Sequence, residues 1–310
     1  MIKTVTLNPA VDKTVEIDNF RLGAVNRISS VRLDAGGKGI NVSKTIKAME
    51  GSSVATGILA GGAGEYIKSY LDRMCIDNDF IFISGETRTN VKVVDRVSRT
   101  NTDINEPGPA VVKEDLGTLE EKVFRGMDSE SILVLSGSIP SNVSSDIYRE
   151  WAERARGLGA RVLLDADGEL LREGIKGSPF LVKPNINELE RLFGTKLDTM
   201  DKLAAASKKL LEAGIEIVAV SLGAEGALFA DGDKVIHAPG LKVEVKSTVG
   251  AGDAMVAALA LSLQRGYTLE RAVTLSTAAG AANVATAGTQ PPRLEDILGY
   301  EGQVRFSYLK

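Results

Sequence analysis

Short apolar runs rich in β-branched residues alternate along the chain with segments whose apolar residues recur at helical spacing. We predict five buried strands, at residues 4–7, 132–135, 162–164, 180–182 and 217–220. Helices are predicted between them, at residues 145–158, 187–193 and 201–213. In the first of these, Ile147, Trp151 and Ala155 fall on one face. This alternation predicts an α/β fold with a mainly parallel central sheet and helices on both of its faces.

Four further segments with strand-like composition interrupt this rhythm, at residues 13–18, 28–33, 89–97 and 98–105. No helix separates the first two, so we expect a small separate sheet. One side of such a sheet needs cover, which predicts a lid over a site or a contact with a partner subunit. The alternative is a pair of surface hairpins without a role. The chain is thus predicted to be one α/β domain, residues 1–310, with a lid from about 12–33 and 87–106.

The predicted lid strands carry apolar residues around Val15, Ile17, Val91 and Val93. Because these residues give the lid an apolar face, we expect two copies of the chain to pack their lids together as a homodimer. A second copy would cover the open side of the small sheet.

Composition narrows the range of functions. The 310 residues are 44% apolar, carry a net charge of −4 and contain no basic run longer than a pair. Nucleic acid and anionic membranes are therefore not expected as partners. Cys75 and His237 are the only residues of their types, which argues against an internal disulfide and a histidine-rich metal site. We expect Cys75 to be a small buried residue and His237 to lie on a strand face.

The first residues are interrupted early by Pro9 and do not form the pattern of a signal peptide. No apolar run approaches the length of a membrane span. Together with the single cysteine, these features predict a cytoplasmic protein.

The segment 247–253, Ser-Thr-Val-Gly-Ala-Gly-Asp, follows a predicted strand at 241–245 and opens a predicted helix at 254–264. Glycines at such a turn let several N–H groups point into one concavity, and the helix start adds the positive end of its dipole. We therefore expect an anion site at Gly250, Ala251 and Gly252, beside the carboxylate of Asp253. The dipole should give Asp253 a low pKa. The alternative is that Gly and Asp only cap the helix.

Polar residues follow each predicted core strand. Asp12 comes shortly after the first strand, and Ser138, Asp165, Lys183 and Ser221 follow the others. If the strands are parallel, these positions share the sheet edge at which ligands bind. We therefore expect one site along that edge.

A second glycine cluster, at residues 35–41, precedes a helical run at 42–49. It is not a Walker A loop, because Gly39 rather than Ser or Thr follows Lys38. Its N–H groups and Lys38 could instead meet sugar hydroxyls or a phosphate.

Four other polar side chains each have two interpretations. Arg27 and Arg88 precede lid strands and could bind a phosphate or be solvated surface residues. Asn185 and Glu188 lie three residues apart at a predicted helix start. They suit Mg²⁺ held largely through water, and they equally suit a helix cap.

Together these segments resemble the PfkB carbohydrate kinases of the ribokinase superfamily, over nearly the whole chain. Two signatures carry the resemblance, Gly-Gly-Lys-Gly-Ile-Asn-Val at 36–42 and Ser-Thr-Val-Gly-Ala-Gly-Asp-Ala-Met at 247–255. The segments 6–12 and 105–109 are similar to the branch that contains 1-phosphofructokinase and tagatose-6-phosphate kinase. The resemblance implies a three-layer ribokinase-like fold with a small β lid.

The resemblance also implies residue roles. Asp253 would accept the proton of the attacking hydroxyl, and the transferring phosphoryl group would be held by Gly250, Ala251 and Gly252. The sugar and its phosphate would be bound by Asp12, Arg27, Gly36, Gly37, Lys38, Asn41, Arg88 and Ser138. ATP would be contacted by Lys183, Asn185, Ser221, Gly223, Thr248, Gly250, Gly252 and Asn283. Mg²⁺ would be held through water by Glu188 and Asn185.

These roles imply a kinase that uses ATP and Mg²⁺ to phosphorylate a ketohexose phosphate, first of all fructose 1-phosphate to fructose 1,6-bisphosphate. Tagatose-6-phosphate kinase and 6-phosphofructokinase are alternatives within the same class. A non-catalytic sugar-phosphate sensor is the alternative from a different class. Some relatives bind a monovalent cation near the loop after the catalytic helix, and residues 287–290 do not decide whether this chain does.

Overall fold

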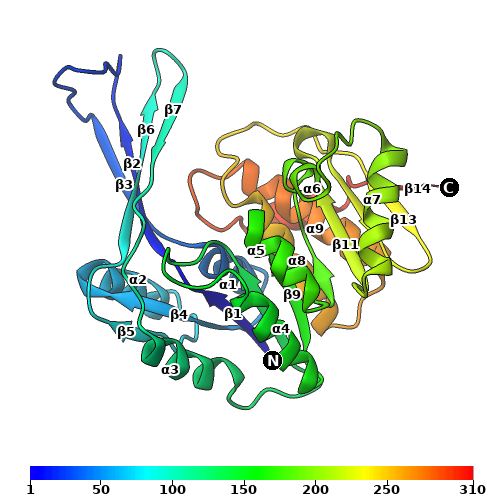
Figure 1. The fold of residues 1–310 in the computed structure, drawn as a ribbon. Helices are drawn as coiled ribbons and strands as arrows, with labels where there is room; N and C mark the ends of the chain where they lie inside the picture. The colour runs from blue at the N-terminus through cyan, green and yellow to red at the C-terminus, as the bar shows by residue number, and fades with distance from the viewer. Residues whose placement is uncertain (310) are drawn as a thin grey trace.

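A computed structural model describes residues 1–309 and contains a large central sheet with a small second sheet beside it (Figure 1). Within those residues the large sheet has ten strands, in the order β14 (Ser307–Leu309), β13 (Val235–Ala238), β12 (Ala227–Ala230), β11 (Ile217–Ser221), β10 (Leu181–Val182), β9 (Arg161–Asp165), β8 (Ile132–Ser136), β1 (Ile2–Thr6), β4 (Val54–Ala60) and β5 (Ile81–Ile83). Pairing is parallel from β5 to β11 and antiparallel from β11 to β14. The five predicted core strands are confirmed and are neighbours, all parallel.

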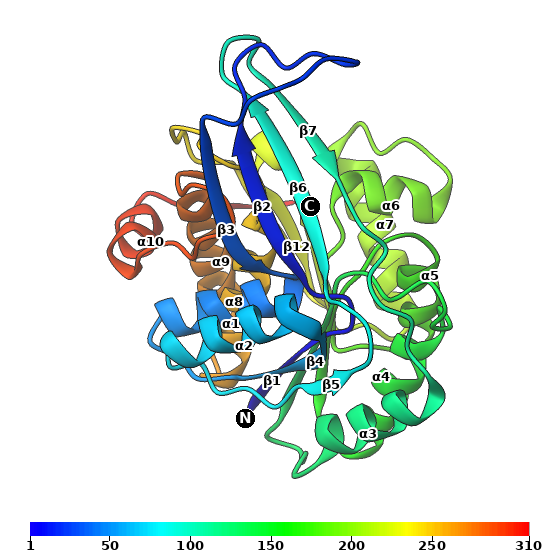
Figure 2. The same cartoon turned by 90° about the vertical axis from the view of Figure 1, so that its left-hand side faces the viewer.

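Alternating apolar side chains on the central strands let helices cover both faces of the sheet. On β8, Leu133 and Leu135 enter one core, whereas Ile132 and Val134 enter the other. The first core is covered by α3 (Lys113–Phe124), α4 (Ile147–Gly157), α5 (Gly168–Lys176), α6 (Ile186–Phe193) and α7 (Met200–Glu212). The second is covered by α1 (Lys38–Ala48), α8 (Ala251–Gln264), α9 (Leu269–Val284) and α10 (Leu294–Glu301). Figure 2 shows the two helical layers, which confirm the predicted three-layer α/β class.

The helix α2 (Gly61–Arg73) packs on a third, smaller apolar cluster with β4. A short 3₁₀ turn, Gly223–Glu225, joins β11 to β12. None of the helices in the described part of the chain is both long and apolar enough to cross a membrane.

The small sheet consists of β3 (Ser30–Gly36), β2 (Ala10–Glu16), β6 (Arg88–Asp95) and β7 (Thr100–Ile104), in that order. It projects from the body of the molecule at the upper left of Figure 1. The strands predicted within 13–18, 28–33, 89–97 and 98–105 are therefore confirmed, as is their separation from the large sheet.

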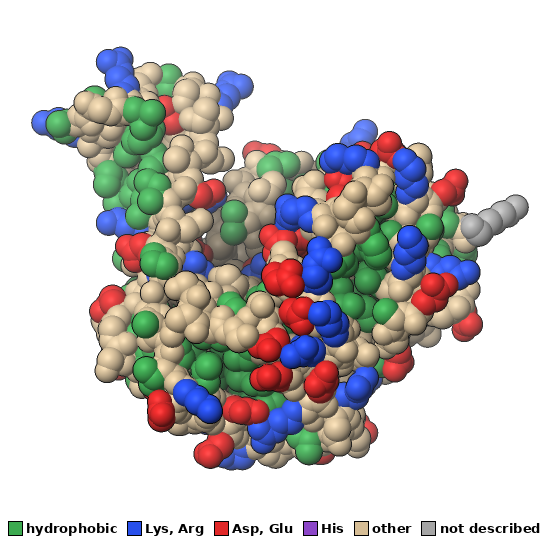
Figure 3. Space-filling view, in the orientation of Figure 1, with side chains coloured by type: hydrophobic (Ala, Val, Ile, Leu, Met, Phe, Trp, Pro, Cys, Tyr) green, Lys and Arg blue, Asp and Glu red, His purple; other side chains and the backbone are tan. Residues whose placement is uncertain are grey.

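The register of the small sheet gives it two different faces. Asp12 on β2 pairs with Asp34 and Asn90, so these polar side chains share one face. Val15 pairs with Val31 and Val93, which places the valines on the opposite face. Val15 and Val93 are buried there beside Phe20, while Val31, Leu33 and Ile104 are exposed. Apolar side chains are visible along the small sheet in Figure 3.

Two predictions about the fold are wrong. The run 241–245 forms no strand. The strand before it, β13, is already paired with β12 and β14, so no strand edge is open to it, and the following Lys246 and Ser247 N–H groups donate to the carbonyl of Val284 instead. Cys75 is exposed rather than buried. It lies just after α2 with φ 51°, where the chain reverses, and the next residue, Ile76, enters the core in its place.

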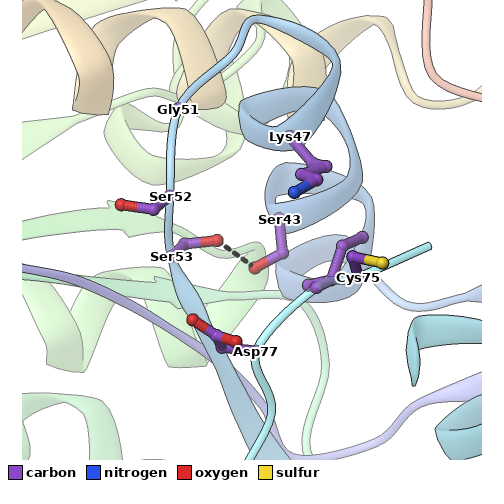
Figure 4. A pocket seen from close by; sticks show the side chains of 8 residues that line it. Ser43, Lys47, Gly51, Ser52, Ser53, Cys75 and Asp77 are labelled. Atoms are coloured by element: carbon purple, nitrogen blue, oxygen red, sulfur yellow. Dashed lines mark hydrogen bonds between the residues drawn. The ribbon is translucent and has the colours of Figure 1, made fainter. Parts of the chain in front are cut away.

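A cavity of about 50 Å³ lies between the end of α1 and the segments 51–53 and 75–77 (Figure 4). On its wall, Ser53 Oγ donates to Ser43 Oγ at 2.9 Å. Small-molecule sites have volumes of roughly 300 Å³ or more. This cavity is therefore too small for a nucleotide or a sugar phosphate, and it lies at the opposite end of α1 from the glycine cluster.

Candidate active site

The helix α8 begins without a side-chain cap. Its N-cap is Gly250, whose φ of 89° lies in the left-handed region that favours glycine. The N–H groups of the first turn have no side-chain acceptor at the N-cap, and ten residues of the helix are buried. An anion can therefore complete this helix start, and the buried helix holds the site rigidly in place.

Asp253 lies in the first turn of α8 and is 6% exposed. Its Oδ2 accepts a hydrogen bond of 2.8 Å from Asn41 Nδ2 at the start of α1. Burial raises the pKa of Asp253 to about 6, although Lys38, Lys183 and the Asn41 hydrogen bond act to lower it. The expected low pKa is therefore wrong, because desolvation outweighs the helix dipole. At neutral pH the carboxylate is still ionised and is a stronger base than an exposed aspartate.

Two lysines meet at Asp165, which ends β9 and is 2% exposed. Lys38 Nζ lies 3.2 Å and Lys183 Nζ 3.4 Å from Asp165 Oδ1. Burial acts to raise the pKa of Asp165, but the two ammonium groups outweigh it and hold the pKa below its usual value. A Cβ placed on Gly252 would lie 3.1 Å from Lys183 Nζ, so this ammonium group lies directly over the start of α8.

The second glycine cluster lies against the small sheet. A Cβ on Gly36 would come within 2.1 Å of Asp12 Oδ2, so only glycine allows this approach. Asp12 Oδ1 accepts from Asn90 Nδ2 at 3.2 Å, and burial raises the pKa of Asp12. Gly37, with φ 116°, is the N-cap of α1 and, like Gly250, has no side chain that could cap the helix. Helix α1 thus offers a second set of N–H groups next to a carboxylate.

Arg88 and Ser138 lie together near this cluster. The Arg88 guanidinium donates to the carbonyls of Asn8, Pro9 and Glu106, and its Nη2 lies 3.5 Å from Ser138 Oγ. These carbonyls fix the guanidinium in place. Gly137 brings the same loop against Lys38, since its Cβ would lie 3.4 Å from the Lys38 side chain.

Arg27 is not brought to this group. It is exposed in the loop that joins β2 to β3, at the end of the small sheet that points away from the body (Figure 1).

On the other side of Lys183, Asn185 and Glu188 form a capping box at the start of α6. Asn185 Oδ1 accepts from the Glu188 N–H at 2.9 Å, and Glu188 Oε2 accepts from the Asn185 N–H at 2.8 Å. The cap interpretation of this pair is therefore confirmed. Burial raises the pKa of Glu188, which is 7% exposed.

The remaining predicted nucleotide contacts lie near the starts of α6 and α8. Ser221 forms a bridge with Asn185 at the end of β11, and Gly223 follows with φ 62°. Asn283 on α9 is 3% exposed and lies near Gly250, where a Cβ would be 3.3 Å from Asn283 Oδ1. That oxygen has no hydrogen-bond partner among the described residues. Thr248 is exposed in the loop before α8.

The pfkB family of carbohydrate kinases matches residues 5–297. This match covers nearly the whole chain, including both glycine-capped helix starts. The chain belongs to the pfkB family.

Named relatives of this pfkB kinase agree in activity. The chain is 39% identical to a 1-phosphofructokinase of Bacillus subtilis over 91% of its length and 92% of the relative. It is 40% identical to a 1-phosphofructokinase of Xanthomonas campestris, covering 89% of this chain and 88% of the relative. Among solved structures, phosphofructokinase-2 of Escherichia coli in complex with potassium superposes with a TM-score of 0.93 at 32% identity, covering 97% and 98% of the two chains. The protein is therefore a sugar kinase, a phosphotransferase with an alcohol acceptor.

Two site residues of the pfkB kinase had no predicted role. Asp165 follows a core strand at the expected edge, so its position was predictable, but its contact with both lysines depends on the meeting of two distant loops. Asn90 lies at an ordinary polar position of a strand, so the sequence did not mark it as a site residue. Its contact with Asp12 depends on the pairing of β2 with β6. Within residues 1–309 no group of three or more His, Cys, Asp or Glu residues could hold a metal ion. Asn185 and Glu188 suit a metal bound mainly by water and substrate phosphates.

Proposed function

We propose that this pfkB kinase transfers the γ-phosphoryl group of ATP to fructose 1-phosphate and forms fructose 1,6-bisphosphate. The observation that carries the proposal is the open N-terminus of α8 with Asp253 beside it. The relatives named 1-phosphofructokinase support the choice of substrate. Tagatose 6-phosphate and fructose 6-phosphate are the alternative substrates.

Asp253 accepts the proton of the attacking hydroxyl in this proposal, and the N–H groups of Gly250, Ala251 and Gly252 hold the transferring phosphoryl group. The raised pKa of Asp253 supports the role, because a base with a pKa near the working pH moves a proton more effectively. Lys183, over the first turn of α8, neutralises charge on the phosphates.

The sugar hydroxyls are bound by Asp12, Gly36, Gly37 and Asn41. The phosphate already on the sugar is bound by Lys38, Arg88 and Ser138, a role supported by the fixed guanidinium of Arg88. Arg27 can join them only if the small sheet moves or a second subunit brings it there.

ATP contacts Asn185, Ser221, Gly223, Thr248 and Asn283. Mg²⁺ bound with ATP would be held through water by Glu188 and Asn185, where it would neutralise phosphate charge. The relative solved with potassium supports a monovalent cation as a further cofactor. Comparing activity in potassium and tetramethylammonium salts tests that point.

We further propose that residues 1–310 form one domain whose small sheet is a lid that excludes water, and that two lids pack together in a homodimer. The exposed Val31, Leu33 and Ile104, on the face opposite Asp12, support the dimer. A monomeric mass by light scattering at micromolar concentration would contradict it. ATP and sugar phosphates suggest a cytoplasmic location.

Comparison of kcat/KM on fructose 1-phosphate, fructose 6-phosphate and tagatose 6-phosphate tests the substrate. We expect fructose 1-phosphate to give the highest value in a coupled ADP-release assay. A higher kcat/KM on fructose 6-phosphate or tagatose 6-phosphate would make that sugar the proposed substrate, and the proposed phosphoryl transfer would stand. Binding of all three without ADP release would favour a non-catalytic sensor, against which the retained Asp253, Lys183 and Glu188 argue.

A further inference from the structure

Lys44 is a buried cation in α1 that the proposed chemistry does not use. It lies one turn beyond Asn41 and is 1% exposed. Its Nζ donates to the carbonyl of Ala35 at 2.9 Å, to Asn41 Oδ1 at 3.2 Å and to the carbonyl of Thr289 at 2.6 Å. All three protons of the ammonium are thereby used, and every acceptor is neutral.

These three acceptors belong to three separate segments: the end of β3, the first turn of α1 and the loop after α9. The ring of Tyr70 lies 5.7 Å from Lys44 Nζ and adds a cation–π contact. Burying an ammonium group without an ion pair carries a large desolvation penalty. The three segments of the site must therefore supply enough hydrogen bonds to hold Lys44 in its charged form.

The contact with Asn41 leads directly to Asp253. The Asn41 amide accepts from Lys44 through Oδ1 and donates to Asp253 Oδ2 through Nδ2 at 2.8 Å. A lysine ammonium can only donate, so it selects the amide orientation in which the oxygen faces Lys44. The opposite orientation would turn the amide oxygen toward the carboxylate. The ionised Asp253 can only accept and favours the same orientation, so Lys44 reinforces it from the other side of the amide.

The contact with Thr289 leads to the other side of the same anion site. The neighbouring Gln290 accepts through its carbonyl from Asn283 Nδ2 at 3.4 Å, and its side chain bonds Asp34. Asn283 in turn lies against Gly250, the N-cap of α8. One ammonium group therefore ties together the segments that border Asp253 and Gly250.

We propose that Lys44 is a positioning residue for phosphoryl transfer, which orients the Asn41 amide toward Asp253 and anchors the loop at Thr289 beside the start of α8. The inference rests on the proposed role of Asp253 as the base. Without Lys44 the amide is held from the Asp253 side alone, which weakens the hydrogen bond that stabilises the ionised carboxylate.

The charged groups around Asp253 and Lys44 set the direction in which loss of Lys44 shifts the pKa of Asp253. Asp253 is faced by Lys38 and Asp165, and by Lys183 over the start of α8. Lys44 is faced by Asp34, Asp12 and Asp253, and also contacts Tyr70. Burial lowers the pKa of Lys44 to about 8, so it is mostly protonated at neutral pH. Removing its charge and the Asn41 hydrogen bond both raise the pKa of Asp253, which moves the acid limb of kcat to higher pH.

Lys44→Met tests the proposal, and Lys3→Met is the matched control. Lys3 is also buried, and its Nζ donates to the carbonyls of Lys122, Val123 and Arg125 at the end of α3. Both variants lose a buried ammonium and three hydrogen bonds, so both should lower Tm. Only Lys44→Met should lower kcat at pH 7, by about 10-fold or more, and shift its acid limb upward by about 0.5 pH unit or more. The profile uses kcat at saturation, because the free sugar phosphate itself titrates near about pH 6.

Asn41→Ala provides the second measurement. It should shift the acid limb in the same direction, and adding Lys44→Met to it should shift the limb further by less than Lys44→Met does alone, because only the direct charge effect of Lys44 remains. If the acid limb of kcat is unchanged in Asn41→Ala, the proposed action of Lys44 through Asn41 is overturned, even if Lys44→Met does not fold. A wild-type profile in Lys44→Met, or an equal further shift in the double variant, also overturns it.

The outcome for Asp253 is read separately. If Asp253→Asn is fully active, the proposed base is wrong. If Asp253→Asn is inactive while Lys44→Met keeps the wild-type profile, only the role of Lys44 fails.

Discussion

Two helices begin on either side of Lys183, and their first turns are built in opposite ways. At α6, Asn185 and Glu188 satisfy each other's backbone N–H groups. At α8, Gly250 offers no side chain, and the N–H groups of the first turn stay open. The difference indicates that the start of α6 is structural and the start of α8 binds a ligand. The chain completes its own hydrogen bonds where it needs a fixed support, and leaves them open where a ligand must complete them.

Replacing the acid at the open helix start should have the largest effect. We expect Asp253→Asn to lower kcat by about 10²–10⁴-fold, because the attacking hydroxyl loses its proton acceptor. Asparagine has nearly the same shape, so the dissociation constant for the sugar phosphate, measured by calorimetry, should stay close to wild type. Near-normal turnover would show that the open start of α8 binds phosphate without a base.

Gly250, at the open start of α8, can be compared with Gly194, at the C-terminal end of the capped helix α6. Gly250 has φ 89° and Gly194, the C-cap of α6, has φ 66°. Alanine at either position should destabilise the fold by about 1–2 kcal/mol, measured by urea unfolding. Only Gly250→Ala should also lower kcat, by about 10–100-fold, because its Cβ meets Asn283 at 3.3 Å beside the phosphoryl site. Equal kcat in the two variants would show that Gly250 has no special role in phosphoryl transfer.

The capped helix start allows the smallest and sharpest test. Gln can replace Glu in a capping box, so Glu188→Gln should keep the cap and change the unfolding free energy by less than about 0.5 kcal/mol. If Glu188 also organises Mg²⁺, the Mg²⁺ concentration for half-maximal activity should rise by about 10-fold. An unchanged Mg²⁺ titration would leave Glu188 as a cap alone.

The sequence predicts those parts of the fold that depend on local patterns. The central strands are short apolar runs that pair in parallel, and the turn before α8 needs glycine for its backbone angles. The strand expected at 241–245 failed because a strand also needs a free partner edge, which the alternation of residues does not reveal.

The chemistry of the site was less predictable because it depends on tertiary burial. A helix start alone suggests a low pKa for Asp253, whereas the packed helix raises it to about 6. The same limit applies to Asp165 and Lys44, which look like an ordinary strand end and an ordinary helix lysine. Each has a partner more than a hundred residues away, Lys38 for Asp165 and Thr289 for Lys44.

The register of β2 has a consequence for how this protein can evolve. Asp12 faces the glycine cluster and Val15 faces outward, only because side chains alternate along the strand. Inserting or deleting one residue between them would exchange the faces, turning acids toward the surface and valines toward the substrate. We therefore expect homologous chains to keep the length of this strand constant.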